Sequence, residues 1–392
     1  MKNLWDDLDT KEFKDDLDFR VYSSNLLGQS DQLVLHGGGN TSVKSKVDGK
    51  DILFVKGSGW DLVSIKREGF APVELRFLED MARLEYLSDK DMVDAQREAM
   101  IDKSAPNPSV EAILHAIIPF KYVDHTHADA VVTISNSKNG IENIKKLFPN
   151  FLVVPYIMPG FILAHEIYKL TKDFDWDLCE GIILHNHGIF TFDDECKRSY
   201  DKMIEAVRCA ENFLEENAPL TIGSEAISNN IDQDRLKQLV SSKKGYDVVC
   251  EVDNSPIALF YSSQENLDHF AKRGVLTPEH IIRTKRVPLI VEDDIEISLE
   301  KFEKEYIDYF NSFKKDEIML NPSPNYAVIK NFGLVYFGKN QKEAMIIKDI
   351  ITHTMEAVLK ADKLGGYQSI SIKDSFDMEY WELEQIKLKC NE

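Results

Sequence analysis

The chain has 392 residues and a mass of 44.9 kDa, a length that favours two domains over one. Its formal net charge of -20 and pI of about 5.0 make most of the surface repel a polyanion, so no nucleic-acid partner is expected. The five cysteines include no C-x-x-C pair, which argues against a disulfide framework or a zinc ribbon. The first residues lack the apolar core of a signal peptide, and no apolar run approaches the roughly 20 residues that cross a bilayer. We therefore expect a cytoplasmic protein without a membrane partner.

Short β-branched runs alternate with helical patterns in the first half of the chain, which predicts an α/β fold. After an acidic N-terminal helix, strands are expected at QLVLH, DILFVKG, AVVTIS, FLVVPY and GIILHNHGIF. Helices are expected around residues 74–87, 109–117 and 194–215. A polar stretch at residues 224–245 separates this half from a second set of strands and helices, and we place the domain boundary near residue 235. The predicted domains are residues 1–235 and 236–392.

The second half contains a weak internal repeat of the first. EGIILHNHGIFTFDDECKRS, from Glu180, aligns without gaps on NYAVIKNFGLVYFGKNQKEA, from Asn325, and each copy leads into an apolar-periodic helix. Chance similarity of two strand-turn-strand-helix units is the alternative. Because Phe332 stands where the first copy has His187, a metal site built on the first copy has no counterpart in the second.

The segment VDHTHAD carries the strongest chemical signal, since His125 and His127 are two residues apart on a predicted strand. The period of two places both imidazoles on one face, an arrangement that holds a cation such as zinc when another element supplies a third ligand. A partly exposed polar face is the alternative. A second pair, His185 and His187, precedes Gly188 in LHNHG, and from the residues alone either histidine could be the third ligand.

A carboxylate and two small-residue loops accompany these histidines. In PNPSVE, Ser109 is a natural N-cap and Glu111 lies in the first helical turn, where an acid is usually structural unless a nearby metal lets it relay a proton. The loop LHGGGNTS offers Asn40, and the loop VKGSGW offers Ser58 and Gly59, with Lys56 as a counter-charge. These loops are either ordinary turns or an oxyanion cradle, and neither has the spacing of a dinucleotide or nucleoside-triphosphate site.

Taken together, these motifs resemble the class II aldolase/adducin family, and specifically the aldolase half of bifunctional rhamnulose-1-phosphate aldolase/short-chain dehydrogenase proteins. The resemblance is co-linear over nearly the whole chain. It rests on VYSSNLLG, LVLHGGGNTSVK, FVKGSGWDL, APNPSVE, VDHTHADA, LHNHGIF, TPEHIIRTKR and FDMEYWELEQIKLK.

The resemblance implies a three-layer α/β/α fold with a mixed sheet, followed by a smaller C-terminal α/β domain without metal ligands. It implies zinc, or another divalent cation, bound by His125, His127 and His187, and it demotes His185. The acid/base glutamate falls on Glu111. The implied phosphate contacts are Asn40, Ser58, Gly59 and Ser109. One departure is Val110, which stands where better-known single-domain aldolases have a second serine, so one phosphate donor is missing.

The implied activity is cleavage of a ketose 1-phosphate, such as rhamnulose 1-phosphate, to dihydroxyacetone phosphate and an aldehyde through a metal-stabilised enediolate. A pentulose-phosphate 4-epimerase of the same family and a non-catalytic, adducin-like assembly module are the alternatives. The family also implies a homo-oligomer. No dehydrogenase activity is expected, because the chain contains no glycine-rich cofactor fingerprint.

Overall fold

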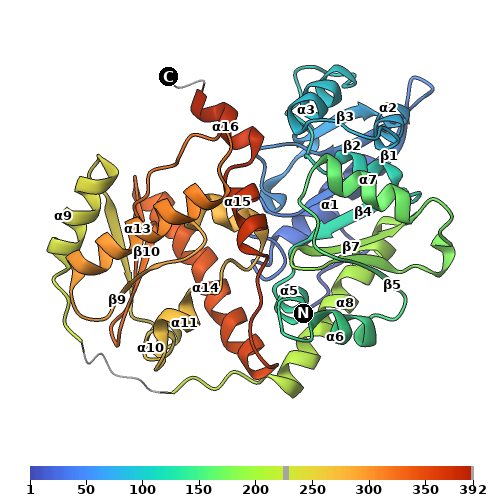
Figure 1. The fold of residues 1–392 in the computed structure, drawn as a ribbon. Coiled ribbons are helices and arrows are strands. Elements are labelled where there is room, and N and C mark those ends of the chain that lie inside the picture. The colour runs from blue at the N-terminus through green and yellow to red at the C-terminus, as the bar shows by residue number, and fades with distance from the viewer. Residues whose placement is uncertain (224–228, 390–392) are drawn as a thin grey trace. The chain divides into compact units, whose positions relative to one another are not determined.

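A computed structural model describes residues 1–223 and 229–389, and the chain divides into two compact units (Figure 1). Unit 1 comprises Met1–Ser135 and Asn139–Leu214. Unit 2 comprises Asn136–Lys138 and the residues from Glu215 onward. In neither unit does any described helix combine the length and the apolar character that a bilayer crossing requires.

The division between the units lies earlier than the boundary predicted near residue 235. That position falls inside helix α9 (Gln233–Lys244), which belongs to unit 2. Part of the polar stretch that prompted the prediction, residues 224–228, lies outside the described residues. The change of unit instead coincides with the end of the long helix α8 (Cys196–Asn217).

A mixed seven-stranded sheet forms the centre of unit 1, in the order β3-β2-β1-β4-β7-β6-β5. Neighbouring strands pair antiparallel except β5 and β6, which are parallel. The strands are β1 (Asn40–Val47), β2 (Lys50–Lys56), β3 (Phe70–Glu74), β4 (Tyr122–Thr126), β5 (Phe151–Val154), β6 (Gly181–Leu184) and β7 (Gly188–Asp193). Besides α8, the helices are α1 (Asp16–Gly28), α2 (Leu75–Ala82), α3 (Asp89–Glu98), α4 (Ala112–Ile117), α5 (Asp129–Ser135), α6 (Gly140–Leu147) and α7 (Phe161–Leu170).

Helices cover both faces of this sheet. Adjacent residues of a strand point to opposite faces, so each strand contributes side chains to both helix layers. Val123 on β4 packs into an apolar core with Leu78 of α2 and Ile167 of α7. Its neighbour Tyr122 packs on the other face with Leu17 of α1. The α/β class, the mixed sheet and the three layers are therefore confirmed.

Two of the predicted strands are wrong. Residues 130–135 (AVVTIS) lie in helix α5, because a short run of buried apolar residues has the same pattern in a helix as in a strand. Residues 32–36 (QLVLH) form turns and irregular backbone. Their carbonyl groups hold the chain beyond β4: Leu33 O accepts from the His127 N–H at 3.0 Å, and Gln32 O accepts from the Asp129 N–H at 2.9 Å.

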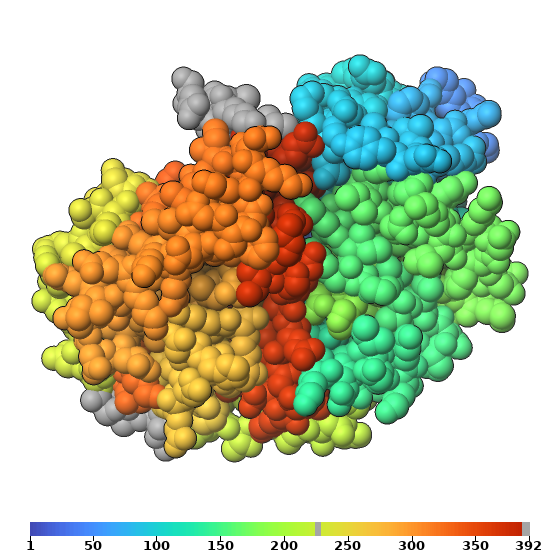
Figure 2. All heavy atoms as spheres, viewed as in Figure 1, coloured from blue at the N-terminus to red at the C-terminus, as the bar shows by residue number. Residues whose placement is uncertain are grey.

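Unit 2 is built on a four-stranded sheet in the order β8-β11-β10-β9, in which only β9 and β10 are parallel. Its core joins Leu236 of α9 and Phe302 of α13 to Val335 of β11, while α14 lies against β8 and β11. Helices α13 and α15 also pack together, orange and red in Figure 2. The strands are β8 (Val249–Asp253), β9 (Leu289–Val291), β10 (Tyr326–Ile329) and β11 (Gly333–Gly338). Besides α9, the helices are α10 (Pro256–Ser262), α11 (Leu267–Ala271), α12 (Ile281–Thr284), α13 (Ile295–Phe313), α14 (Gln341–Lys363), α15 (Ile372–Glu379) and α16 (Glu382–Lys389).

The two copies of the repeat have the same local structure. Strands β6 and β7 form an antiparallel hairpin before α8, and β10 and β11 form one before α14. The turn residues Asn186 and Asn331 both have positive φ, of 58° and 55°, a conformation that asparagine tolerates better than most residues. The hairpins differ at the position of the predicted metal ligand, where the first has His187 and the second has Phe332.

Candidate metal centre

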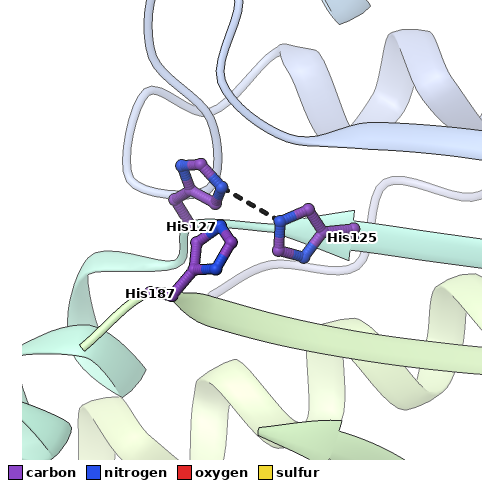
Figure 3. Close-up of side chains that lie close together, drawn as sticks. All are labelled: His125, His127 and His187. Carbon is purple, nitrogen blue, oxygen red and sulfur yellow. Dashed lines mark hydrogen bonds between the residues drawn. The ribbon is translucent and has the colours of Figure 1, made fainter. Parts of the chain in front are cut away.

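Three histidines, in or directly next to the neighbouring strands β4 and β7, meet at one end of the sheet of unit 1 (Figure 3). His125 is on β4, and His127 lies one residue beyond the end of that strand. Their Nε2 atoms are 3.0 Å apart. The third, His187, directly precedes β7, and a ligand atom from each of the three lies within 4.8 Å of the others. The structure thus brings together the three predicted metal ligands.

Gly188 makes this approach sterically possible. A Cβ at this position would lie 2.5 Å from Thr126 O, 2.9 Å from His125 Cε1 and 3.1 Å from His127 Cδ2. A side chain there would push the hairpin turn away from β4 and take His187 with it. The glycine is therefore required by close packing against the histidine pair.

The ring of His125 is oriented as metal-binding imidazoles usually are. Its Nδ1 donates to the backbone carbonyl of Ile189 at 3.1 Å, which leaves the Nε2 lone pair directed towards His127. The ring stacks on Phe190 with centroids 4.0 Å apart, so its rotation is restricted. His125 and His187 are buried and His127 is half-buried. Three imidazole nitrogens with one tautomer fixed by the backbone suit a divalent cation such as zinc.

The carboxylate of Glu111 faces this cluster. Its Oε2 is 3.5 Å from His125 Nε2, and its Oε1 is 3.7 Å from His187 Nε2. The side chain is 6% exposed, so it does not serve as an ordinary solvated acid at a helix start. Helix α4 begins at Ala112, later than predicted, and the hydroxyl of Ser109 accepts from the Glu111 N–H at 3.3 Å.

A directed chain of hydrogen bonds ends on this carboxylate. Asn40 Nδ2 donates to Glu111 Oε2 at 2.7 Å, which places Asn40 Oδ1 against His115 Nε2. That nitrogen must then carry the proton, so His115 Nδ1 accepts from the hydroxyl of Ser42 at 2.8 Å. Burial lowers the pKa of His115 well below its usual value, which keeps the ring neutral as this chain requires.

The sequence analysis did not single out His115 as part of the site. The available signal was spacing: residue 115 follows residue 111 by four positions, which on a helix places both side chains on the same face. Asn40 was predicted to contact the phosphate. In the structure its amide nitrogen is bonded to Glu111 and its amide oxygen to His115, so the amide holds the carboxylate instead.

A buried ion pair lies on the opposite face of β4 from His125. Arg20 on α1 bonds the carboxylate of Asp124, and its guanidinium also donates to the carbonyl of Ser42 at 3.2 Å. Both charged side chains are fully buried. The pair fixes β1 against β4, the two strands that carry Asn40 and His125, and nothing in the sequence pattern indicated it.

Backbone hydrogen bonds join the VKGSGW loop to the PNPSVE segment that leads into helix α4. The Ser58 N–H donates to Asn107 O at 2.8 Å, and the Ser109 N–H donates to Lys56 O at 3.0 Å. Ser58 and Gly59 are exposed, and Ser109 is half-buried. Lys56 is buried, and burial lowers its pKa to about 8 against the opposing attraction of Asp61 and Glu111.

His185 does not join the cluster. It shares a 2.9 Å hydrogen bond with the hydroxyl of Ser135, and burial lowers its pKa. Along the part of the chain that the structure describes, the histidine trio is the one group of potential ligands close enough to hold a metal, and it lies in unit 1.

Family models match both halves of the chain. The class II aldolase and adducin N-terminal domain matches residues 21–214, and the second domain of class II aldolases matches residues 230–388. Among solved structures, the N-terminal class II aldolase domain of a conserved protein from Thermoplasma acidophilum is 40% identical, with a TM-score of 0.50, over 55% of this chain and 99% of that one. An L-fuculose-1-phosphate aldolase from Thermus thermophilus is 14% identical, with a TM-score of 0.34, over 51% of this chain and 95% of that one.

One curated relative, named an uncharacterized oxidoreductase, YuxG, of Bacillus subtilis (strain 168), is 28% identical over 420 residues. The match covers 99% of this chain but only 60% of that protein, so the chain spans less than two thirds of the relative's length. The two family models and the Thermoplasma structure agree with the resemblance seen in the sequence motifs. The chain belongs to the class II aldolase/adducin family.

Proposed function

We propose that this protein is a metal-dependent aldolase that cleaves a ketose 1-phosphate into dihydroxyacetone phosphate and an aldehyde. The observation that carries the proposal is the position of the buried Glu111 carboxylate, 3.5 Å and 3.7 Å from the Nε2 atoms of His125 and His187. A carboxylate that shares its surroundings with a metal-binding trio can move a proton at the carbon next to a carbonyl. Family membership and the fold of unit 1 agree with lyase chemistry.

Each part of the site has a role in this proposal. His125, His127 and His187 would hold a divalent cation such as zinc, which supplies Lewis-acid stabilisation of the negative charge that develops as the carbon–carbon bond breaks. Glu111 moves the proton at the carbon of the three-carbon fragment. Asn40, held by His115, keeps Glu111 Oε2 fixed and leaves Oε1 directed towards His187.

The substrate phosphate would bind where the VKGSGW loop meets the PNPSVE segment. The hydroxyls of Ser58 and Ser109 and the backbone N–H of Gly59 would supply the donors, because the N–H groups of the two serines are already bonded to Asn107 O and Lys56 O. Lys56, in the same loop as Ser58, would supply a positive charge. Rhamnulose 1-phosphate is the proposed representative of the substrate class. With this sugar the released aldehyde is lactaldehyde.

The oxidoreductase name of the Bacillus subtilis relative is not carried over to this chain. The chain matches 60% of that protein, and its sequence contains no dinucleotide fingerprint.

A substrate panel tests the proposal. Ketose 1-phosphates, pentulose phosphates and unphosphorylated ketoses are assayed with added zinc and again after chelation. We expect zinc-dependent release of dihydroxyacetone phosphate from a ketose 1-phosphate. Epimerised pentulose phosphate without aldehyde release would replace the aldolase by an epimerase, and full activity in metal-stripped protein would overturn the metal-dependent mechanism.

A further inference from the structure

Strand β9 forms one outer edge of the sheet of unit 2 (Figure 1). It pairs with β10, and Val291 O accepts from the Lys330 N–H at 2.9 Å. Backbone groups alternate in direction along a strand, so the N–H and C=O of Ile290 point away from β10, where no other described strand pairs with them. The edge therefore offers one donor and one acceptor to an extended peptide.

A cavity of about 270 Å³ lies beside this edge and includes no residue of the proposed reaction. Its apolar part combines Ile290 of β9 with the buried side chains of Pro288 and Phe302. Ile297, in the first turn of α13, also lines the cavity and is 68% exposed. Apolar surface at this cavity is therefore open to a ligand.

The two lysines at this cavity are already paired with carboxylates. Lys272 Nζ lies 2.6 Å from Glu305 Oε2 and 2.9 Å from Asp268 Oδ1. Lys301 Nζ lies 3.4 Å from the same Asp268 oxygen and 3.9 Å from Glu305 Oε1. Since each ammonium group has carboxylate partners, the lysines give the cavity no reason to attract an anion.

The carboxylates of Glu292 and Asp293, in contrast, are available to a ligand. Both residues follow β9 directly, line the cavity and are exposed. Within the described residues neither carboxylate forms an ion pair or a hydrogen bond. Asp294 differs, because its side chain accepts from the Ile297 N–H at 2.9 Å as the N-cap of α13. The charge open to a ligand is negative, which favours a cationic one.

We propose that this cavity is a docking site for an extended segment of a basic partner protein. An aliphatic side chain of the segment fills the apolar part of the cavity, and its backbone bonds to the N–H and C=O of Ile290. A neighbouring lysine or arginine of the segment faces Glu292 and Asp293. A second copy of this chain is disfavoured, because its net charge of -20 repels an acidic cavity. The proposal does not depend on the aldolase activity of unit 1.

Peptide binding to the full-length protein tests the proposal. Short acetylated and amidated peptides, in which valine alternates with lysine or with glutamate, are titrated by calorimetry, and lysine amide is the small-amine probe. We expect the lysine peptide to bind and the glutamate peptide not to bind. Lysine amide should bind about tenfold or more weakly than the lysine peptide, because it lacks the aliphatic neighbour and the extended backbone.

Two matched pairs of variants locate the binding. Glu292→Lys should weaken binding of the lysine peptide by about tenfold or more, because a like charge then faces the segment. Glu300→Lys is its control, since Glu300 is exposed and lies outside the cavity lining. Ile297→Ser should weaken binding and Ile307→Ser should not, because both residues are exposed on α13 and only Ile297 lines the cavity. All four side chains are exposed, so the variants should fold.

Three results would overturn the proposal. No binding of the lysine peptide, or equal binding by Glu292→Lys and Glu300→Lys, would leave the two acids with the sole role of keeping other strands away from β9. Binding of lysine amide as tight as that of the lysine peptide would assign the cavity to a small amine instead.

Discussion

The side-chain amide of Asn40 donates a 2.7 Å hydrogen bond to Glu111 Oε2, although the two residues are 71 positions apart. The bond connects β1 to the start of α4 and fixes the carboxylate relative to the histidine trio. Because the other end of the amide is held by His115, the orientation of Asn40 is not free to invert. The position of the proposed acid/base group therefore depends on two residues outside the histidine trio.

Glu111→Gln should abolish most turnover while leaving the metal in place. The amide keeps nearly the same volume but cannot take up the proton, and general acid–base catalysis is typically worth about 100- to 10,000-fold in rate. Steady-state kinetics and metal analysis of the same preparation check both statements. Loss of metal together with activity would instead identify Glu111 as a ligand.

Asn40→Ala and Ser58→Ala should have different kinetic effects. Without Asn40 the carboxylate loses its fixed position, so kcat should fall by about 10- to 100-fold with metal content unchanged. Ser58 is proposed to bind the phosphate in substrate and transition state alike, so its loss should raise KM and leave kcat nearly intact. A raised KM with unchanged kcat for Asn40→Ala would instead indicate that Asn40 contacts the substrate phosphate.

His187→Ala and His185→Ala form a matched pair that tests the ligand assignment. Loss of a residue that only hydrogen-bonds a metal ligand typically weakens metal affinity roughly 10- to 100-fold, and removal of His187, a proposed ligand itself, should weaken it by more than that. Removal of His185 should break its bond to Ser135, at about 1 kcal/mol of stability, and retain the metal. Competition with a chromogenic chelator measures the metal affinity of both variants. A larger loss of affinity in His185→Ala than in His187→Ala would assign His185 as the ligand in place of His187.

Gly188→Ala should lose the metal through a backbone effect. Its Cβ would meet Thr126 O at 2.5 Å, so the turn must move away from β4 and carry His187 with it. The corresponding substitution in the other hairpin, Gly333→Ala, would meet Asp253 O at 2.2 Å and should also destabilise the protein. Both variants should melt earlier, but only the first should release zinc; retention of zinc by Gly188→Ala would contradict the steric argument.

Lys44 should make the stability of the protein depend on alkaline pH. Burial lowers its folded-state pKa to about 8 from the usual 10.5, so between these values the unfolded chain binds more protons and the free energy of unfolding rises with pH. The rise should be on the order of 1–3 kcal/mol. Urea titrations at pH 8 and pH 10 should show a smaller rise in the free energy of unfolding for Lys44→Met than for the wild type. An equal rise in both proteins would contradict the lowered pKa of Lys44.

The sequence by itself determined the local parts of this site. The two-residue spacing of His125 and His127, the glycine after His187 and the small-residue loops are properties of short segments, and the α/β alternation follows from the same local periodicity. These features, with the motif order, were sufficient for the fold class and the family. Periodicity was misleading at residues 130–135, where a fully buried helix has no polar face to distinguish it from a buried strand.

Only the tertiary structure decided which of these parts meet. From the residues alone His185 and His187 were equivalent, and the turn at Asn186 separates them, sending one to Ser135 and the other to the trio. The hydrogen-bonded chain through His115 and the Arg20–Asp124 pair joins segments that are far apart in sequence. Such contacts depend on the order of strands in the sheet, which places β1 and β7 on either side of β4, and no local pattern of residues contains that order.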